Sequence, residues 1–162
     1  LRRYLVAHGP ATREEFARWW GFQPADARRV IESIENELTL VDRDGDKAYV
    51  LKKDLKTLEK SEEDDEVRAL GMFDAYTLAG LPHPSIVPKN KKSVVYRTGA
   101  WVSQVIVRGG QVVGVWTHKA KPTGTDFEVK LFTKRSVSKA AVERALEPLL
   151  PFTGDIRTLK VS

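Results

Sequence analysis

The stretch Thr12-Arg13-Glu14-Glu15-Phe16-Ala17-Arg18-Trp19-Trp20-Gly21 carries the signals that begin and end a helix. Thr12 followed three residues later by Glu15 is a capping box, in which each side chain accepts a hydrogen bond from the other residue's backbone N–H. Gly21 adopts at low cost the left-handed conformation that ends a helix. We therefore predict a helix from about Arg13 to Trp20. The spacing of Trp19 and Trp20 after Phe16 favours core packing over base stacking for both indoles.

The residues around this helix complete a recognisable order of elements. Residues 1–8 are typical of a short helix that Gly9-Pro10 stops, and residues 24–37 are typical of a third helix with one apolar face. The runs 39–41 and 48–51 flank an Asp-Gly pair, which predicts a β-hairpin. Three helices followed by a hairpin is the order of a winged helix, which we expect over residues 1–60.

Charge divides the chain into three parts. Residues 1–60 hold 12 Lys and Arg against 11 Asp and Glu, residues 61–66 carry five acids and no base, and residues 67–162 hold 15 Lys and Arg against 6 Asp and Glu. Like charges in a row repel and extend, so we interpret residues 61–66 as an acidic linker. The basic part beyond it indicates a polyanionic partner such as nucleic acid.

The part after the linker has the alternation of β-strands. Runs at 101–107 and 111–117 surround Gly109-Gly110, and a two-residue turn there sets Val105 opposite Gly114, with Trp116 and Trp101 on the same face as Val105. A third strand at 127–132 alternates cleanly and follows a loop at 119–125, a helix is expected from Ser138 to about Leu150, and a closing strand at 156–161. The predicted fold class is α+β: a winged helix followed by a small, mostly antiparallel β-barrel with a covering helix.

Several classes of protein are excluded by composition. The sequence has no cysteine, which removes disulfides and Cys-type zinc sites, and its three histidines have no metal-ligand spacing. No apolar run is long enough to span a membrane, and the first residues lack a secretory signal. The chain opens without Met, as if cut from a longer protein. We expect a cytoplasmic protein with no metal, no cofactor and no membrane contact.

Three segments resemble a known family. Gly9-Pro10-Ala11-Thr12 with Phe16-Ala17-Arg18-Trp19-Trp20-Gly21, then Phe73-Asp74-Ala75-Tyr76, then Gly110-Gln111-Val112-Val113-Gly114-Val115-Trp116 are similar, in this order, to motifs of bacterial winged-helix DNA-binding proteins related to the AlkZ-like DNA glycosylases. The resemblance spans about residues 1–116. One departure is the segment 81–84, Leu-Pro-His-Pro, where the family usually has an arginine.

The resemblance implies tandem winged helices and a β-barrel that hold double-stranded DNA. It also implies excision of alkylated or crosslinked bases with water positioned by a Gln-x-Gln or Gln-x-Asp motif. That motif has no counterpart in residues 1–162, so we expect it upstream and expect this portion alone to be inactive. The alternative from another class is a non-catalytic winged-helix regulator or interaction module, and a third reading is a barrel that binds a small ligand.

The candidate DNA contacts form one helical pair and several basic clusters. Residues 24–37 carry four acids against Arg28 and Arg29, so we favour a packing role for this helix over reading of the major groove. The basic clusters are expected to meet phosphates, although charge runs are often only solvated faces. Asp74 is interpreted as a carboxylate that caps a turn or pairs with Arg68, with a catalytic role as the alternative. The candidate DNA-binding residues are Lys119, Lys121, His118, Lys89, Lys91, Lys92, Lys134, Arg135, Arg28 and Arg29.

Overall fold

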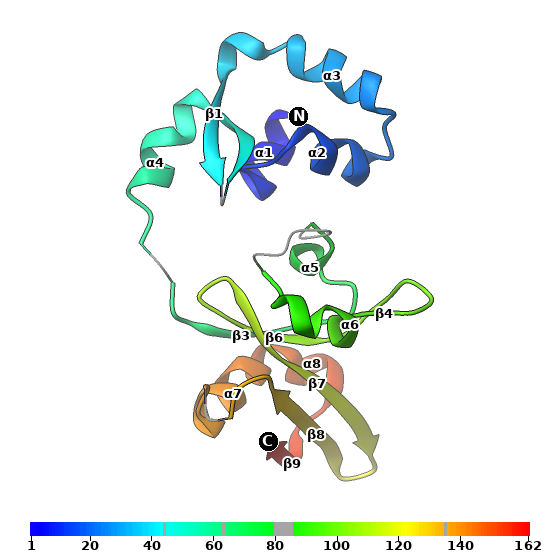
Figure 1. Cartoon of the computed structure of the whole chain (residues 1–162). Coiled ribbons are helices and arrows are strands. Elements are labelled where there is room, and N and C mark those ends of the chain that lie inside the picture. The colour runs from blue at the N-terminus through cyan, green and yellow to red at the C-terminus, as the bar shows by residue number, and fades with distance from the viewer. Residues whose placement is uncertain (44, 63, 80–85, 135) are drawn as a thin grey trace. The chain divides into compact units, whose positions relative to one another are not determined.

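The computed structural model describes residues 1–43, 45–62, 64–79, 86–134 and 136–162. The chain divides into two compact units, Leu1–Glu62 and Glu63–Ser162 (Figure 1). The first unit is mainly helical with one hairpin, and the second is built on a five-stranded sheet. The fold is therefore mixed α+β, as predicted.

The first unit begins with three helices, α1 (Arg2–His8), α2 (Arg13–Trp20) and α3 (Pro24–Glu32). The predicted capping box at the start of α2 is confirmed: Glu15 N donates to Thr12 Oγ1 at 3.2 Å, and Thr12 N donates to Glu15 Oε2 at 2.7 Å. Gly21 ends α2 in the left-handed conformation, with φ 67°. The predicted bounds of this helix are thus correct at both ends.

The third helix is shorter than predicted. It ends at Glu32, and a 3₁₀ turn, η1 (Glu35–Glu37), follows in place of the expected helical residues. Ser33 Oγ donates to Val30 O at 2.8 Å, and Ile34 N donates to Ile31 O, so the hydrogen bond spans three residues in place of four and the turn is tighter. The tighter turn keeps the apolar side chains on one side, so Ile31, Ile34 and the following Leu38 are all buried.

The hairpin consists of the antiparallel strands β1 (Leu38–Arg43) and β2 (Asp46–Leu51). Ala11, in the connection between α1 and α2, exchanges two backbone hydrogen bonds with Tyr49 of β2. The short helices η2 (Lys52–Asp54) and α4 (Leu55–Glu59) follow the hairpin. The core of this unit contains the following buried residues: Tyr4, Leu5, Ala11, Phe16, Ala17, Ala27, Ile31, Ile34, Leu38 and Leu51.

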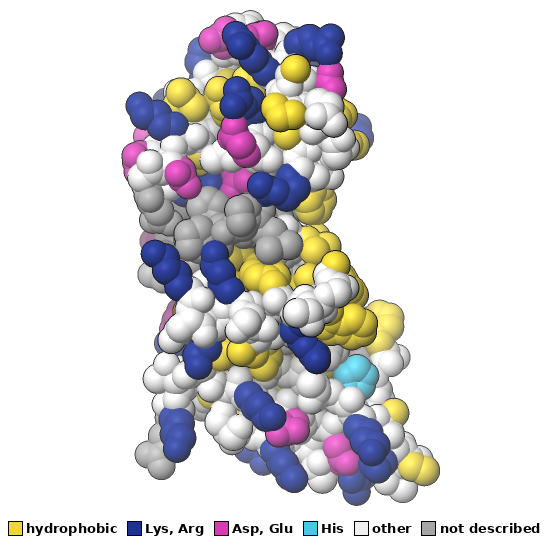
Figure 2. Space-filling model, turned by 45° about the vertical axis from the view of Figure 1, so that its right-hand side comes forward, with side chains coloured by type: hydrophobic (Ala, Val, Ile, Leu, Met, Phe, Trp, Pro, Cys, Tyr) yellow, Lys and Arg dark blue, Asp and Glu magenta, His cyan; other side chains and the backbone are white. Residues whose placement is uncertain are grey.

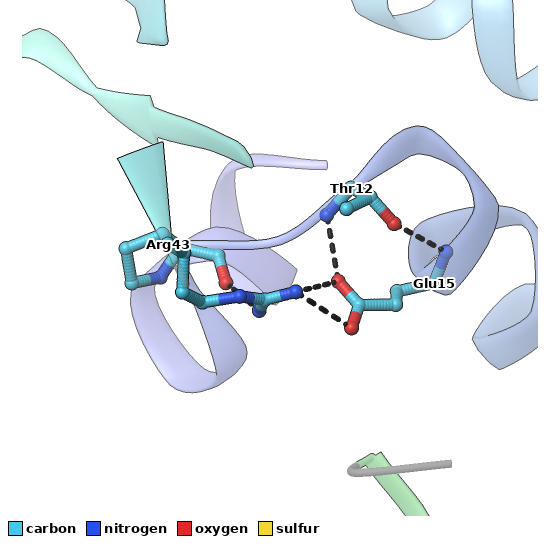
Figure 3. A network of polar contacts seen from close by, with 4 residues as sticks. Thr12, Glu15 and Arg43 are labelled. Carbon is cyan, nitrogen blue, oxygen red and sulfur yellow. Dashed lines mark hydrogen bonds and ion pairs between the residues drawn. The ribbon is translucent and has the colours of Figure 1, made fainter. Parts of the chain in front are cut away.

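A buried ion pair ties α2 to the hairpin (Figure 3). Arg43, the last residue of β1, donates from Nη2 to both carboxylate oxygens of Glu15 at 2.8 and 2.9 Å, and from Nη1 to Pro10 O. The Glu15 side chain is only 7% exposed and that of Arg43 is 24% exposed. The Glu15 carboxylate therefore has a second role besides the capping box: it orients strand β1, which follows α3 and η1 in the sequence.

The sheet of the second unit has the order β3-β6-β7-β8-β9. Its pairs are antiparallel except β8 with β9, which are parallel. Among the described residues β3 and β9 are edge strands, so the predicted closed barrel is wrong and the sheet is open. Among the described residues the four-residue β3 pairs only with β6, and helix α7 (Lys139–Leu146) packs against it. The strand bounds are Val67–Leu70 (β3), Val105–Arg108 (β6), Gln111–Lys121 (β7), Gly124–Leu131 (β8) and Ile156–Val161 (β9).

A β-bulge corrects the predicted register of the β6–β7 hairpin. Arg108 pairs with Gln111 around the Gly109-Gly110 turn as expected, but Val105 pairs with Val115 and not with Gly114. The bulge gives β7 an extra residue at Val113, and an extra residue reverses the alternation of the strand beyond it. Trp116 therefore packs with Ile106 in one core cluster, while Val105 and Val115 lie in the other. Both faces of the hairpin are apolar and covered, as predicted.

The remaining elements surround the sheet. The predicted strand 101–107 is interrupted, because residues 101–102 leave the sheet and pair with β4 in a separate hairpin. The predicted helix from Ser138 is confirmed at its start, where Ala141 N donates to Ser138 Oγ at 3.2 Å, but it ends at Leu146 because Pro148 has no N–H to continue it. These elements are α5 (Ala75–Ala79), η3 (Lys89–Lys91), α6 (Lys92–Val95), β4 (Tyr96–Arg97), β5 (Trp101–Val102), α7 (Lys139–Leu146), η4 (Glu147–Leu149) and α8 (Leu150–Thr153).

Within the described part of the chain, none of the helices has the length and apolarity needed to cross a membrane.

Candidate nucleic-acid interface

The two arginines of α3 have their charges compensated within the helix. Arg28 Nε donates to Glu32 Oε1 at 2.7 Å, and Arg29 pairs with Asp26. The hydrogen bond that Arg28 donates to Glu32 raises the pKa of Arg28 above its ordinary value. Both guanidinium groups are exposed, but each already has an acidic partner one turn away.

The lysines of the β7–β8 hairpin lie on a strand, which corrects the predicted loop at 119–125. Strand β7 continues to Lys121 and β8 begins at Gly124, so only Pro122 and Thr123 form the turn. Lys119 and Lys121 are two residues apart and share one face of β7. Both are exposed, and neither forms an ion pair with any described residue.

The acid opposite these lysines is already engaged. Asp126 lies across the ladder from Lys119. It pairs with Arg157 and accepts a hydrogen bond from Thr158 Oγ1 at 2.6 Å. The hydrogen bonds from Arg157 and then Thr158 lower the pKa of Asp126. Asp126 therefore stays charged and forms its ion pair with Arg157, and the nearby charge of Lys121 also lowers its pKa. One acid thus lies near three cations, Lys119, Lys121 and Arg157, so positive charge is in excess here.

His118 separates from the two lysines, although all three were predicted as one cluster. Alternation places His118 on the other face of β7, where its ring centroid lies 5.7 Å from Trp116 and 6.1 Å from Phe127. Its Nδ1 is 3.3 Å from Gln104 Nε2. The structure thus brings two of the three residues together.

The second predicted cluster comes from η3 and α6. Lys89 is exposed, while Lys91 and Lys92 are half-buried, and Lys91 Nζ lies 5.5 Å above the ring centre of Phe132. Of the third cluster, Lys134 is exposed and Arg135 lies outside the described residues. In Figure 2 the second unit shows Lys and Arg side chains in excess over Asp and Glu.

The acidic stretch is not a free run of repelling charges. Asp65 accepts two hydrogen bonds from Arg108, at 2.5 and 2.7 Å, which lower its pKa. Arg68 pairs with Asp64 at 2.6 Å and Glu66 at 2.5 Å. Sequence reasoning missed these pairs, because the arginines that form them stand on strands β3 and β6.

Asp74 caps a turn, which was one of its two expected structural roles. Its Oδ1 accepts from Tyr76 N at 2.8 Å, and its carbonyl accepts from Thr77 Oγ1 at the start of α5. The expected alternative, a pair with Arg68, is not present, since Arg68 bonds to acids two and four residues away.

The predicted core packing of Trp19 and Trp20 is wrong, and Trp101, which was expected on a covered face of the sheet, is exposed as well. Trp20 is 57% exposed and stacks on Phe22, Trp19 is partly exposed against Tyr4 and His8, and Trp101 is 45% exposed. Helix α2 has only Glu15, Phe16 and Ala17 buried, so its apolar stripe is narrower than the aromatic spacing suggested. Trp101 is exposed because its strand leaves the sheet.

Among the described residues no three His, Cys, Asp or Glu side chains are grouped as metal ligands. The second unit thus carries exposed lysines on β7 and an exposed aromatic ring at Trp101.

Comparison with known proteins gives the family. The DNA glycosylase AlkZ-like family matches residues 1–152, and the chain belongs to this family. It is 37% identical over 120 residues to an interstrand DNA cross-link repair glycosylase of Streptomyces sahachiroi. The matched region covers 72% of this chain and 32% of that protein. The solved structure of S. sahachiroi DNA glycosylase AlkZ is similar with a TM-score of 0.84 and 31% identity, over 99% of this chain and 43% of that chain. The chain thus spans less than half the length of either relative.

Proposed function

We propose that this chain is the DNA-contacting portion of an AlkZ-like glycosylase that removes alkylated or crosslinked bases from double-stranded DNA. Family membership supports the reaction class, and the relative's name supports crosslinked DNA as the substrate. The Gln-x-Gln or Gln-x-Asp motif that positions water would belong to a part of the protein outside these 162 residues, because neither pattern occurs in them.

The first unit would serve as a winged helix whose third helix has mainly a packing role. In favour of this role, Ala27 and Ile31 of α3 are buried in the core, and the charges of Arg28 and Arg29 are compensated. A phosphate would have to compete with an acid already bonded to each guanidinium. The wing hairpin is a poor phosphate contact as well, since Arg43 is committed to Glu15.

The second unit would hold most of the phosphate contacts. The observation that carries this proposal is the pair Lys119 and Lys121, which project together from β7 while the nearest cross-strand acid is bound to Arg157. Two cations that form no ion pair with a described residue and share one face of a long hairpin release counterions when they meet a duplex backbone or enter a minor groove. Further contacts would come from Lys89, Lys91, Lys92, Lys134, Arg135 and His118.

The test removes two charges from either unit and compares the results. Binding to a labelled duplex is measured by fluorescence anisotropy between about 50 and 200 mM salt, where each phosphate contact contributes a slope of about 0.9 to the log–log plot. Lys119→Ala with Lys121→Ala is expected to lower that slope by up to about 1.8 and to weaken all sequences equally. Arg28→Ala with Arg29→Ala changes the net charge by the same amount and is the matched control. A larger loss for the arginine pair would make α3 the DNA reader and refute the proposal.

A further inference from the structure

Two aromatic rings of the second unit are exposed side by side. Phe73 and Trp101 are each 45% exposed, and their ring centroids are 5.7 Å apart in an edge-to-face arrangement. Phe73 lies in the turn before α5, and Trp101 begins β5. Figure 2 shows exposed hydrophobic side chains at the level of α5, α6 and the β4–β5 hairpin, with Lys and Arg side chains around them.

The backbone under both rings is held in an unfavourable conformation. Phe73 has φ 58°, and Ala100, next to Trp101, has φ 59°; among the described residues these are the only non-glycine residues with positive φ. A residue with a Cβ adopts this region only where the surrounding structure imposes it, and such strain is concentrated at functional sites. The two strained positions thus adjoin the same exposed pair.

Hydrogen bonds fix the elements that carry the rings. Tyr76 Oη donates to Gly110 O at 2.6 Å, and Tyr96 Oη donates to Thr77 O at 3.1 Å, which joins β4 to α5. Ser103 donates to Val94 O from Oγ and to Val95 O from N, which closes the β4–β5 hairpin onto α6. The rings therefore stand on a rigid base, and a ligand that covers them would order little additional chain.

The sequence around the rings is rich in positive charge. Residues 75–125 contain seven Lys and Arg and no Asp or Glu. Arg97 is paired with Trp101 across the β4–β5 ladder, is exposed, and forms no ion pair with a described residue. Asp74, the acid beside Phe73, is occupied as the cap of α5. An exposed aromatic pair with the cation Arg97 beside it matches a ligand with both a flat face and a phosphate.

We propose that Phe73 and Trp101 form a stacking platform for a nucleobase that has lost its pairing partner, with Arg97 near the phosphate of the same nucleotide. The inference rests on the proposed DNA contact of this unit and adds the part of the DNA that the rings recognise. Every unpaired base offers a free face for stacking, whereas the bases of an intact duplex are already stacked on their neighbours. The platform would therefore favour the disturbed site over the surrounding duplex.

The test compares two duplexes of equal length and equal phosphate number. One is fully paired, and the other has an abasic site opposite the central adenine, which leaves that adenine unpaired. The chain is expected to prefer the second duplex, and Trp101→Ala is expected to weaken binding to it by about 5- to 150-fold, the range for loss of one stacked base. Binding of the paired duplex is expected to change by less than about twofold, and Trp101→Phe is expected to restore the preference because it keeps an aromatic face.

Two further variants separate stacking from folding. Phe73→Gly removes a ring at a position where glycine is the residue best suited to the positive φ of the backbone. A loss of binding to the duplex with the unpaired adenine in this variant therefore cannot come from added backbone strain. Phe152→Ala removes a ring that is 87% exposed in α8 and is the matched control, with no change expected on either DNA.

Several results would overturn the inference. Wild-type binding of both DNAs by Trp101→Ala and Phe73→Gly would do so, as would an equal loss on both DNAs. A variant that keeps both affinities but changes the sedimentation of the chain would make the platform a contact between copies. If the wild-type chain binds neither duplex, the proposed function falls as well; if it binds both equally with a normal salt slope, only the platform falls.

Discussion

Replacing Glu15 by alanine is expected to destabilise the first unit more than any single change on its surface. Glu15 is 7% exposed and performs two tasks: its carboxylate accepts from Thr12 N in the capping box, and it binds the guanidinium of Arg43. Alanine removes both at once. It also leaves Arg43, 24% exposed, beside Pro10 O without its carboxylate partner.

The magnitude follows from these two losses. Removing a helix cap costs about 0.5–2 kcal/mol. Breaking a buried ion pair from one side costs about 3–5 kcal/mol, and the partial exposure of Arg43 places this pair at the low end. A loss of about 3–4 kcal/mol corresponds to a fall in Tm of at least about 12 °C for a unit of this size.

Circular dichroism with thermal and urea unfolding measures the effect, and a double-mutant cycle assigns it. Glu14→Ala is the matched control, because the adjacent Glu14 pairs only with Arg13 among the described residues and is exposed; a loss of no more than about 0.5 kcal/mol is expected. Arg43→Ala in the Glu15→Ala background is expected to cost less than it does alone, because the pair is already broken. Additive losses, or a Glu15→Ala loss no greater than that of Glu14→Ala, would refute the reasoning.

Three other outcomes are expected. Gly114→Ala should destabilise the second unit by about 1–3 kcal/mol, since a Cβ there would lie 2.7 Å from Lys130 O, whereas Gly71→Ala meets no atom within 4 Å and should be neutral; equal urea midpoints would contradict this. Arg108 lowers the pKa of Asp65, so the stability that this pair gives is present above the ordinary carboxyl range and is lost as the pH falls below about 4. The acid shift in Tm should therefore be smaller in Asp65→Asn, and an identical shift would count against the pair. The purified 162-residue chain should release no base from alkylated duplex DNA, and chromatographic detection of a free alkylated base would disprove that.

Local signals predicted the first unit well because its elements are specified by nearby residues. The capping box and Gly21 define α2 within ten residues, and the Asp-Gly pair defines the hairpin. The end of α3 was not predictable in the same way, since Ser33 and Ile34 are compatible with a helix until a side-chain hydrogen bond and the tighter turn compete with it. Periodicity alone also does not show how wide a buried stripe is, which explains the exposed Trp20.

The second unit depended on contacts that are distant in sequence. No sequence signal near Trp101 predicts that its strand leaves the sheet and pairs with β4. No signal near Val113 predicts a β-bulge. One ion pair of the acidic stretch joins Asp65 to Arg108, which is 43 positions away in the sequence. Charge composition still indicated that the second unit is basic, because the net charge of a segment does not depend on how its strands are arranged. The pairing of individual charges does depend on that arrangement, and this pairing determines which cations lack an acidic partner.

The bulge at Val113 connects the register of the sheet to the proposed interface. Beyond the bulge the faces of β7 are exchanged, so Trp116 enters the core with Ile106 and His118 follows it on the same face. Lys119 and Lys121 consequently project from the opposite face, across from Asp126. With the regular register the two lysines would instead lie on the face of the sheet that carries Ile106. One extra residue in β7 thus determines from which face of the sheet the lysines of this hairpin project.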